Sequence, residues 1–244
     1  MRNRQVTVQK RMFFSVFAVV ACLFFFACGI PVYYVIEPPQ SDHIPTYETD
    51  APSERYFGFI CPYSASSENS DFSLAGTEIY YRIYNNVDEM NSDISRINSS
   101  NSEYSENGYR RMTELEYQSI WSSTGDSPVI KKKTSSRTIK LWLRSEGEGV
   151  YPAGIYDATN NDALLSVPYR KGTGSSGSGN MNFEFTSSYH PNSIDTDTKM
   201  TASEQTSNEW YVNLYAVSVG WDSSLSQHYS SVLHLGNLKI TQKQ

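Results

Sequence analysis

The stretch WYVNLYAVSVGW, Trp210–Trp221, decides the fold class of this 244-residue chain. Its aromatic and β-branched residues are the types that favour strands. Successive side chains of a strand point to opposite faces, and here both faces are largely apolar. A strand with two apolar faces is covered on both sides, as the centre of a sheet is. The sequence therefore predicts a central strand at Trp210–Trp221.

Other strand patterns surround this one. In TEIYYRIY (Thr77–Tyr84), Ile79, Tyr81 and Ile83 fall on one face. RTIKLWLRS (Arg137–Ser145) alternates in the same way. Shorter strands are predicted at Asn180–Phe185, Ser231–Leu235 and Asn237–Ile240, with Gly236 as a bulge or tight turn between the last two. These patterns predict a mainly β protein, an antiparallel β-sandwich of two sheets packed face to face.

A helical insertion is predicted near residues 86–117. Asn86 can cap a helix, and Glu89 follows three residues later, as in a capping box. A second, shorter helix is expected at Gly108–Tyr117, with Met112 and Leu115 inward. The first helix would bury one face, formed by Val87, Met90, Ile94 and Ile97.

Two segments resemble the fibronectin type III family and related immunoglobulin-like domains. LAGTEIYYRIYN (Leu74–Asn85) resembles the third strand of that family, and WYVNLYAVSVG (Trp210–Gly220) resembles its penultimate core strand. Trp210 stands where the family usually has tyrosine. The resemblance implies an immunoglobulin-like sandwich. About 125 residues separate the two segments, so the helices and the strand at Arg137–Ser145 form an insertion, a second sheet or a second domain.

The first 30 residues have the pattern of an export signal. Four basic residues precede an apolar stretch, Met12–Ala27. The end of this stretch overlaps CLFFFACGI (Cys22–Ile30). This pattern resembles a bacterial lipoprotein signal, and CGIPVYYVIEPP after it is similar to spirochaete-type lipoproteins. The resemblance implies cleavage between Ala27 and Cys28, acylation of Cys28, and a partner that is membrane lipid. Phe25 and Phe26 depart from the usual aliphatic and small residues.

Three alternatives to this signal remain open. Val19–Cys22 fits the cleavage motif more closely, although its apolar core would be short. Met12–Ile36 is long enough for a single-pass transmembrane anchor. Ordinary cleavage and release is the third. If Cys28 is acylated, Gly29 replaces the aspartate that retains many lipoproteins in the inner membrane, which favours the outer membrane by analogy.

The predicted division of the chain is a signal peptide at 1–27, a lipidated Pro-rich tether at 28–55 and a domain at 56–244. Loss of the four basic signal residues lowers the formal net charge from −6 to −10. Such an acidic domain is unsuited to nucleic acid, with Lys131–Lys133 as a local exception at a hairpin edge. Cys22 leaves with the signal and Cys28 is acylated, so Cys61 is the one cysteine left with a thiol. We therefore expect no internal disulfide and a small buried side chain at Cys61.

No motif in the sequence specifies a cofactor, a metal site or a catalytic centre. GTGSSG (Gly172–Gly177) has dinucleotide-site spacing, but the strand expected after it indicates a hairpin loop. Asp195 and Asp197 could begin a calcium loop, but Lys199 occupies the next alternate position. The carboxylates Glu146 and Glu148 are a candidate pair whose separation in space would decide their use. The four histidines are scattered, at His43, His190, His228 and His234.

Solvent-facing aromatic residues are the remaining functional signal. Alternation places Tyr80, Tyr84 and Trp142 on the polar faces of their strands, a candidate recognition surface for a protein or glycan. Basic side chains adjoin them, at Arg82, Lys140 and Arg144. The first functional hypothesis is a non-catalytic binding module on the cell envelope. The alternatives are a structural or assembly lipoprotein and an extracytoplasmic hydrolase with a dispersed site.

Overall fold

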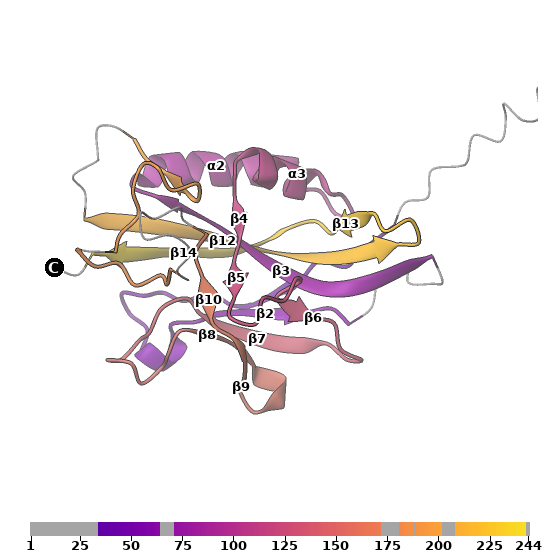
Figure 1. Cartoon of the computed structure of the whole chain (residues 1–244), viewed down its shortest axis with the longest axis horizontal. Coiled ribbons are helices and arrows are strands. Elements are labelled where there is room, and N and C mark those ends of the chain that lie inside the picture. The colour runs from indigo at the N-terminus through magenta and orange to yellow at the C-terminus, as the bar shows by residue number, and fades with distance from the viewer. Residues whose placement is uncertain (1–33, 64–70, 172–180, 188, 202–207, 243–244) are drawn as a thin grey trace, which may run out of the picture. The chain divides into compact units, whose positions relative to one another are not determined.

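The larger of two main sheets is built around strand β12 (Glu209–Asp222), which confirms the predicted central strand. The computed structural model describes residues 34–63, 71–171, 181–187, 189–201 and 208–242 (Figure 1). β12 pairs antiparallel with β3 (Phe72–Tyr84) on one side and with β14 (Leu233–Thr241) on the other. Shorter strands complete this sheet: β4 (Gln118–Ser119), β6 (Ile130–Lys131), β11 (Thr198–Lys199) and β13 (Gln227–Tyr229).

The smaller sheet is antiparallel throughout and has the order β1-β2-β7-β8-β9. A separate pair joins β5 (Trp121–Ser122) to β10 (Pro168–Tyr169). The five strands of the smaller sheet are β1 (Gln40–His43), β2 (Phe57–Cys61), β7 (Arg137–Trp142), β8 (Gly154–Asp157) and β9 (Ala163–Ser166). The mainly β class and the sandwich-like arrangement of antiparallel sheets are therefore confirmed.

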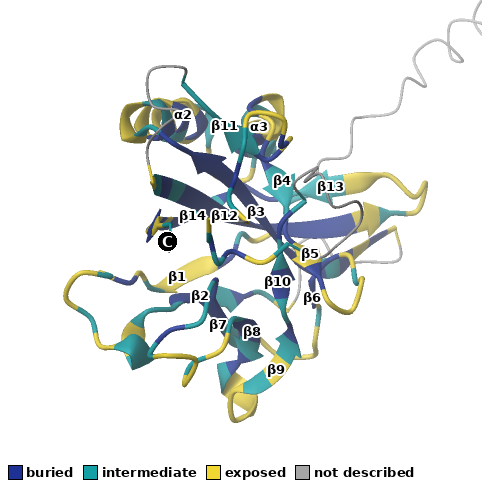
Figure 2. Ribbon diagram, turned by 60° about the vertical axis from the view of Figure 1, so that its left-hand side comes forward, coloured by how far each residue is buried: buried dark blue, intermediate teal, exposed yellow. Residues whose placement is uncertain are grey.

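Two apolar layers hold the sheets and helices together. Ile79, Tyr81 and Ile83 of β3 belong to the layer that also contains Phe57 and Leu141 of the smaller sheet. The opposite face of the larger sheet is covered by helices α2 (Val87–Ser100) and α3 (Asn107–Glu114), as Figures 1 and 2 show. The second layer lies there and includes Tyr80, Tyr84, Tyr215, Met90, Ile97 and Met112. β3 and β12 are thus buried on both faces.

The helical insertion begins where the sequence predicts. The Asn86 side chain accepts hydrogen bonds from the backbone N–H groups of Asp88 (2.8 Å) and Glu89 (3.0 Å). These bonds satisfy donors that have no partner inside the helix. The inward face contains Met90 and Ile97, whereas Val87 in the first turn is 39% exposed. The expectation that Val87 is inward was therefore wrong.

Three other expectations change in detail. Part of the predicted tether is folded: β1 pairs with β2, and Ile36 is buried beside Phe72 and Leu74. Of the strand predicted at Asn180–Phe185, the described residues form only one bridge, from Met181 to Arg170. The two strands predicted around Gly236 are one strand, β14, and a register shift beside Gly236 (φ +117°) makes the expected bulge.

Cys61 is a buried residue, as expected. Its side chain belongs to the layer between the sheets and forms no disulfide. Burial raises the pKa of its thiol to about 12, so the thiolate that reacts or binds metal is not formed at neutral pH. Cys61 therefore acts as a small apolar side chain in the core.

A buried ion cluster fastens a long loop to the larger sheet. Arg170 donates to Asp195 Oδ2 (3.0 Å) and to both Asp197 oxygens (3.0 and 2.9 Å), and all three residues are at most 3% exposed. Tyr81 Oη of β3 donates to Asp197 at 2.7 Å. These contacts use the two aspartates that the sequence offered as the start of a calcium loop. They serve as partners of an arginine.

Replacement of Arg170 should destabilise the fold strongly. Arg170→Met leaves two buried carboxylates without their cation, a loss of about 3–5 kcal/mol in the free energy of unfolding. Lys239→Met is the matched control, because Lys239 pairs with Glu209 at the surface, where water and salt screen the pair and it adds little to stability. Urea denaturation of both variants measures the difference. Equal midpoints would contradict a structural role for the cluster.

Candidate functional site

The predicted surface of Tyr80, Tyr84 and Trp142 does not exist in the folded protein. These residues are 7%, 0% and 7% exposed. Tyr80 and Tyr84 lie on the face of β3 that the helices cover, and Trp142 lies on the smaller sheet. The prediction was wrong because alternation identifies two faces of a strand but does not show whether a helix covers the polar one.

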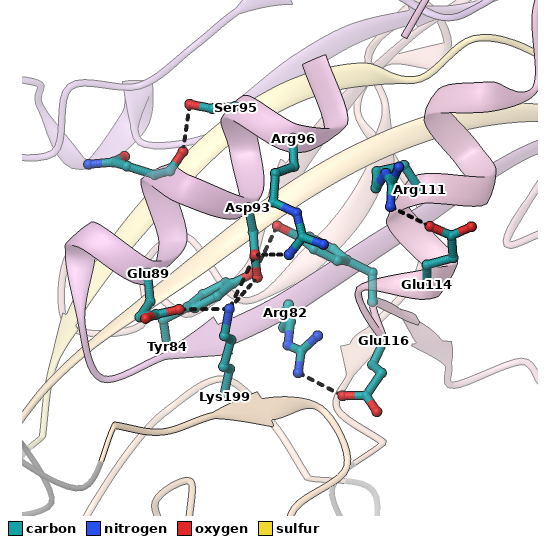
Figure 3. A network of polar contacts seen from close by, with 12 residues as sticks. Arg82, Tyr84, Glu89, Asp93, Ser95, Arg96, Arg111, Glu114, Glu116 and Lys199 are labelled. Atoms are coloured by element: carbon teal, nitrogen blue, oxygen red, sulfur yellow. Dashed lines mark hydrogen bonds and ion pairs between the residues drawn. The ribbon is translucent and has the colours of Figure 1, made fainter. Parts of the chain in front are cut away.

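Tyr84 belongs to a polar network beneath α2 (Figure 3). Its hydroxyl lies 3.1 Å from Asp93 Oδ2 and 3.0 Å from Tyr117 Oη. Lys199 Nζ reaches Asp93 Oδ2 (3.0 Å) and Glu89 (2.7 Å), which ties β11 to the helix. Burial is the main cause that raises the pKa of Tyr84 above its ordinary value. Arg82, the basic neighbour expected beside this tyrosine, pairs with Glu116 at 2.9 Å. The network joins the helical layer to the sheet.

Trp142 is enclosed by aromatic side chains from β8 and from the segments next to β2 and β8. Its ring stacks on Tyr151 (centroids 6.0 Å apart), meets Tyr156 edge to face (5.4 Å) and contacts Tyr56 (4.9 Å). Lys140 Nζ lies 5.3 Å from the Tyr56 ring. Trp142 is therefore a packing residue on this sheet.

The carboxylates Glu146 and Glu148 do line one cleft, of about 210 Å³, together with Glu184. Each oxygen of Glu146 is already bound: Arg55 lies 3.3 Å from Oε2, and Arg144 donates to Oε1 at 2.7 Å. Both oxygens of Glu146 are thus engaged by side chains of the protein itself, and Glu146 serves as an ion-pair partner of two arginines.

The histidines do not assemble a site. His234 Nε2 lies 2.7 Å from Asn213 Oδ1, and burial lowers the pKa of His234 to about 4. His43 and His190 contact backbone oxygens. His228 contacts Asp222 (2.9 Å) at the end of β12. Within the described ranges, no three histidine, cysteine or acidic side chains are grouped as a metal site would require.

A different cleft, of about 240 Å³, collects the groups suited to a polar ligand. Its walls come from β3, from β4 and β5, from the turn after β5 and from the residue that follows Arg170. We call it the Trp121 cleft and define it by Glu78, Ser119, Trp121, Asp126, Ser127 and Lys171. Trp121 is 51% exposed, in contrast to the buried Trp142 and Trp210.

Glu78 is a buried carboxylate of this cleft and is 7% exposed. Tyr80 Oη donates to its Oε2 at 2.6 Å, and Ser127 Oγ donates to its Oε1 at 2.9 Å. A carboxylate oxygen has two lone pairs, so one hydroxyl donor on each oxygen leaves room for a second donor. Glu78 can therefore accept further hydrogen bonds from a ligand.

The other charged groups of the cleft differ in their partners. Asp126 is paired with Lys131 at 2.6 Å, and hydrogen bonds from Lys131 and Thr124 lower the pKa of Asp126. Lys171 Nζ contacts the neutral Ser119 Oγ at 2.7 Å. The cleft thus offers hydrogen-bond acceptors, hydroxyl groups and an ammonium beside an exposed indole.

Sequence reasoning did not find this site. Trp121 stands in QSIWSSTGDSP (Gln118–Pro128), where an aromatic residue is set among turn formers. That composition was the available signal, because a tryptophan set among turn-forming residues is expected near the surface. Ser119, Asp126 and Ser127 lie in the same stretch, whereas Glu78 and Lys171 lie far away in the sequence.

Substitution of the two tryptophans should separate packing from exposure. Trp142→Ala removes a buried ring, and we expect it to lower the free energy of unfolding by about 3–5 kcal/mol. Trp121→Ala should change it by less than about 1 kcal/mol, because half of that side chain already faces solvent. Thermal and urea unfolding of both variants measure the contrast. Similar losses in the two variants would contradict the burial of Trp142.

In comparisons with known proteins, no protein family model, no curated protein and no solved structure matches the chain. The resemblance to fibronectin type III domains therefore stays a prediction. Across the described residues, no helix has the length and apolar character needed to span a membrane. Ala27 and Cys28 lie outside the described residues, as does Gly172–Gly177.

Proposed function

We propose that this protein is a lipid-anchored binding module of a bacterial cell envelope and that the Trp121 cleft binds a saccharide unit of a glycan. The observation that carries the proposal is the exposed indole of Trp121 beside a buried carboxylate with free acceptor capacity. The binding role predicted from the sequence is kept, but the site is now the Trp121 cleft and not the surface predicted at Tyr80, Tyr84 and Trp142.

The chemistry of a sugar ring complements this cleft. One face of a pyranose presents C–H groups, and an indole offers a large flat apolar surface for them. The rim of the ring presents hydroxyl groups, which donate to carboxylates and accept from hydroxyls and ammonium groups. Glu78, Ser119, Ser127 and Lys171 supply those partners. Apolar packing with a few placed polar groups is typical of small-ligand sites.

Binding without catalysis is favoured by the state of the two acids. A glycosidase needs one protonated carboxyl group as general acid. Glu78 accepts hydroxyl donors on both oxygens, and Asp126 is paired with Lys131. The hydrogen bonds from Lys131 and Thr124 lower the pKa of Asp126, which disfavours its protonated form. The hydrolase alternative predicts release of reducing sugar from a bound glycan, and the binding proposal predicts none.

The anchor in this proposal is the acylated Cys28, with the outer membrane as the favoured location. The support for it is the order of basic residues, apolar stretch and cysteine in the first 28 residues. A single-pass anchor at Met12–Ile36 remains the alternative.

Trp121→Ala should weaken saccharide binding at least about tenfold, because stacking of the sugar ring on the indole supplies a large share of the binding free energy at a small site. The full chain, in a detergent without a sugar head group, is screened on a glycan array, and hits are titrated calorimetrically. Trp221→Ala is the matched control, since Trp221 is 41% exposed and is not part of the cleft. An equal loss in both variants would argue against the cleft.

Acylation is tested by metabolic labelling of a bacterial host with an alkyne-tagged palmitate. We expect label on the wild type and on Cys22→Ala, and none on Cys28→Ala, because only the residue at the new N-terminus carries lipid. Loss of label in Cys22→Ala alone would move the lipid site to Cys22. Equal labelling of the wild type and both variants would reject acylation at either cysteine.

A further inference from the structure

The position of Lys171 is fixed by the buried ion cluster. Its backbone N–H donates to Tyr81 Oη at 2.5 Å, and its neighbour Arg170 is 3% exposed between Asp195 and Asp197. The side chain leaves this anchored backbone and reaches Ser119 of β4 at 2.7 Å. The ammonium therefore stands at a defined place in the wall of the Trp121 cleft.

Within the described part of the chain, the ammonium of Lys171 contacts the hydroxyl group of Ser119 and takes part in no ion pair. Five other lysines each pair with a carboxylate: Lys131, Lys133, Lys140, Lys199 and Lys239. An ammonium has three N–H donors, so two remain after the bond to Ser119. In an acidic protein, this cation is available to a ligand.

Neither acid of the cleft, Glu78 or Asp126, forms an ion pair with Lys171. Asp126 is held by Lys131 at 2.6 Å, and Glu78 accepts from Tyr80 and Ser127. The cleft thus separates a carboxylate suited to ligand hydroxyl groups from an ammonium suited to a ligand anion. Hydrogen bonds between charged partners are stronger than those between neutral ones.

We infer that the Trp121 cleft prefers an acidic saccharide, in which a ring carboxylate pairs with Lys171 while ring hydroxyl groups donate to Glu78. This inference rests on the proposed function and deepens it by naming the ligand class. A hexuronic acid has this chemistry: it presents hydroxyl groups and one carboxylate on a single ring.

The test compares matched sugars that differ only in the carboxylate. The probes are the methyl glycosides of glucose, galactose and mannose, each beside the corresponding methyl uronide. They are titrated calorimetrically into the full chain in a detergent without a sugar head group. For the ring that binds, we expect the uronide to bind roughly five- to tenfold more tightly, between the strength of an exposed ion pair and that of a charged hydrogen bond.

Two further measurements assign the preference to Lys171. Lys171→Met should abolish the preference, because it removes the ammonium that pairs with the ring carboxylate. The readout is the ratio of the two affinities, since loss of the Lys171 contacts to Ser119 and to ring hydroxyl groups weakens both sugars alike. Lys239→Met is the charge-matched control at a distant surface pair and should keep the preference. In the unmodified protein, raising salt from about 0.05 M to 0.5 M should reduce the preference, since salt screens accessible charges.

The outcomes distinguish this inference from the function on which it rests. Equal binding of a neutral glycoside and its uronide, or a preference that persists in Lys171→Met, overturns the inference and leaves saccharide binding intact. A preference that is unchanged by salt also overturns it, and this result does not depend on whether Lys171→Met folds. Failure of every glycoside and uronide to bind the wild type overturns the proposed function and the inference together.

Discussion

The antiparallel pairing of β3 with β12 is the constraint on which the rest of the structure depends. The register runs from Tyr84 opposite Tyr211 to Phe72 opposite Asp222, so almost the whole length of both strands is used. Both strands carry large apolar or aromatic side chains on their two faces, and such a pair is stable only when each face is covered. The smaller sheet covers one face and the helical insertion covers the other. The second sheet and the helical insertion thus have the same effect, because each shields one face of the β3–β12 pair from water.

Buried tyrosines on β3 connect this pair to distant parts of the chain. Tyr81 faces the smaller sheet and donates to Asp197, while Tyr84 faces the helices and contacts Asp93. A buried hydroxyl or carboxylate without a partner costs free energy, so each contact fixes where the partner segment lies. Polar groups in the two layers therefore specify the packing of segments that apolar contacts alone would leave free to shift. The ion cluster at Arg170 does this for the loop that ends at β11.

Local patterns predicted the local structure well. The central strand, the cap at Asn86 and the bulge near Gly236 each depend on residues within a few positions of one another. The prediction at Tyr84 failed because the helix that follows β3 folds back over it, and alternation contains no information about which face of the strand that helix covers. The Trp121 cleft could not be predicted, because Glu78, Trp121 and Lys171 meet only through the tertiary fold. The strand expected at 180–185 was wrong in the described residues for a related reason: Phe183 and Phe185 enter the core from irregular backbone.

The sequence separation of the cleft residues has a consequence for how the protein is made. Lys171 is placed by Arg170, and Arg170 is placed by Asp195 and Asp197. These aspartates precede β12, the strand on which the larger sheet depends. Contacts between residues far apart in sequence form late, because the entropy of closing long loops is lost before the contacts are gained. A nascent chain that ends near Lys171 contains every residue of the cleft but none of the later segments that hold Lys171 in place. The Trp121 cleft is thus among the last features to form, and under the proposed function a bound saccharide would indicate that synthesis and folding are complete.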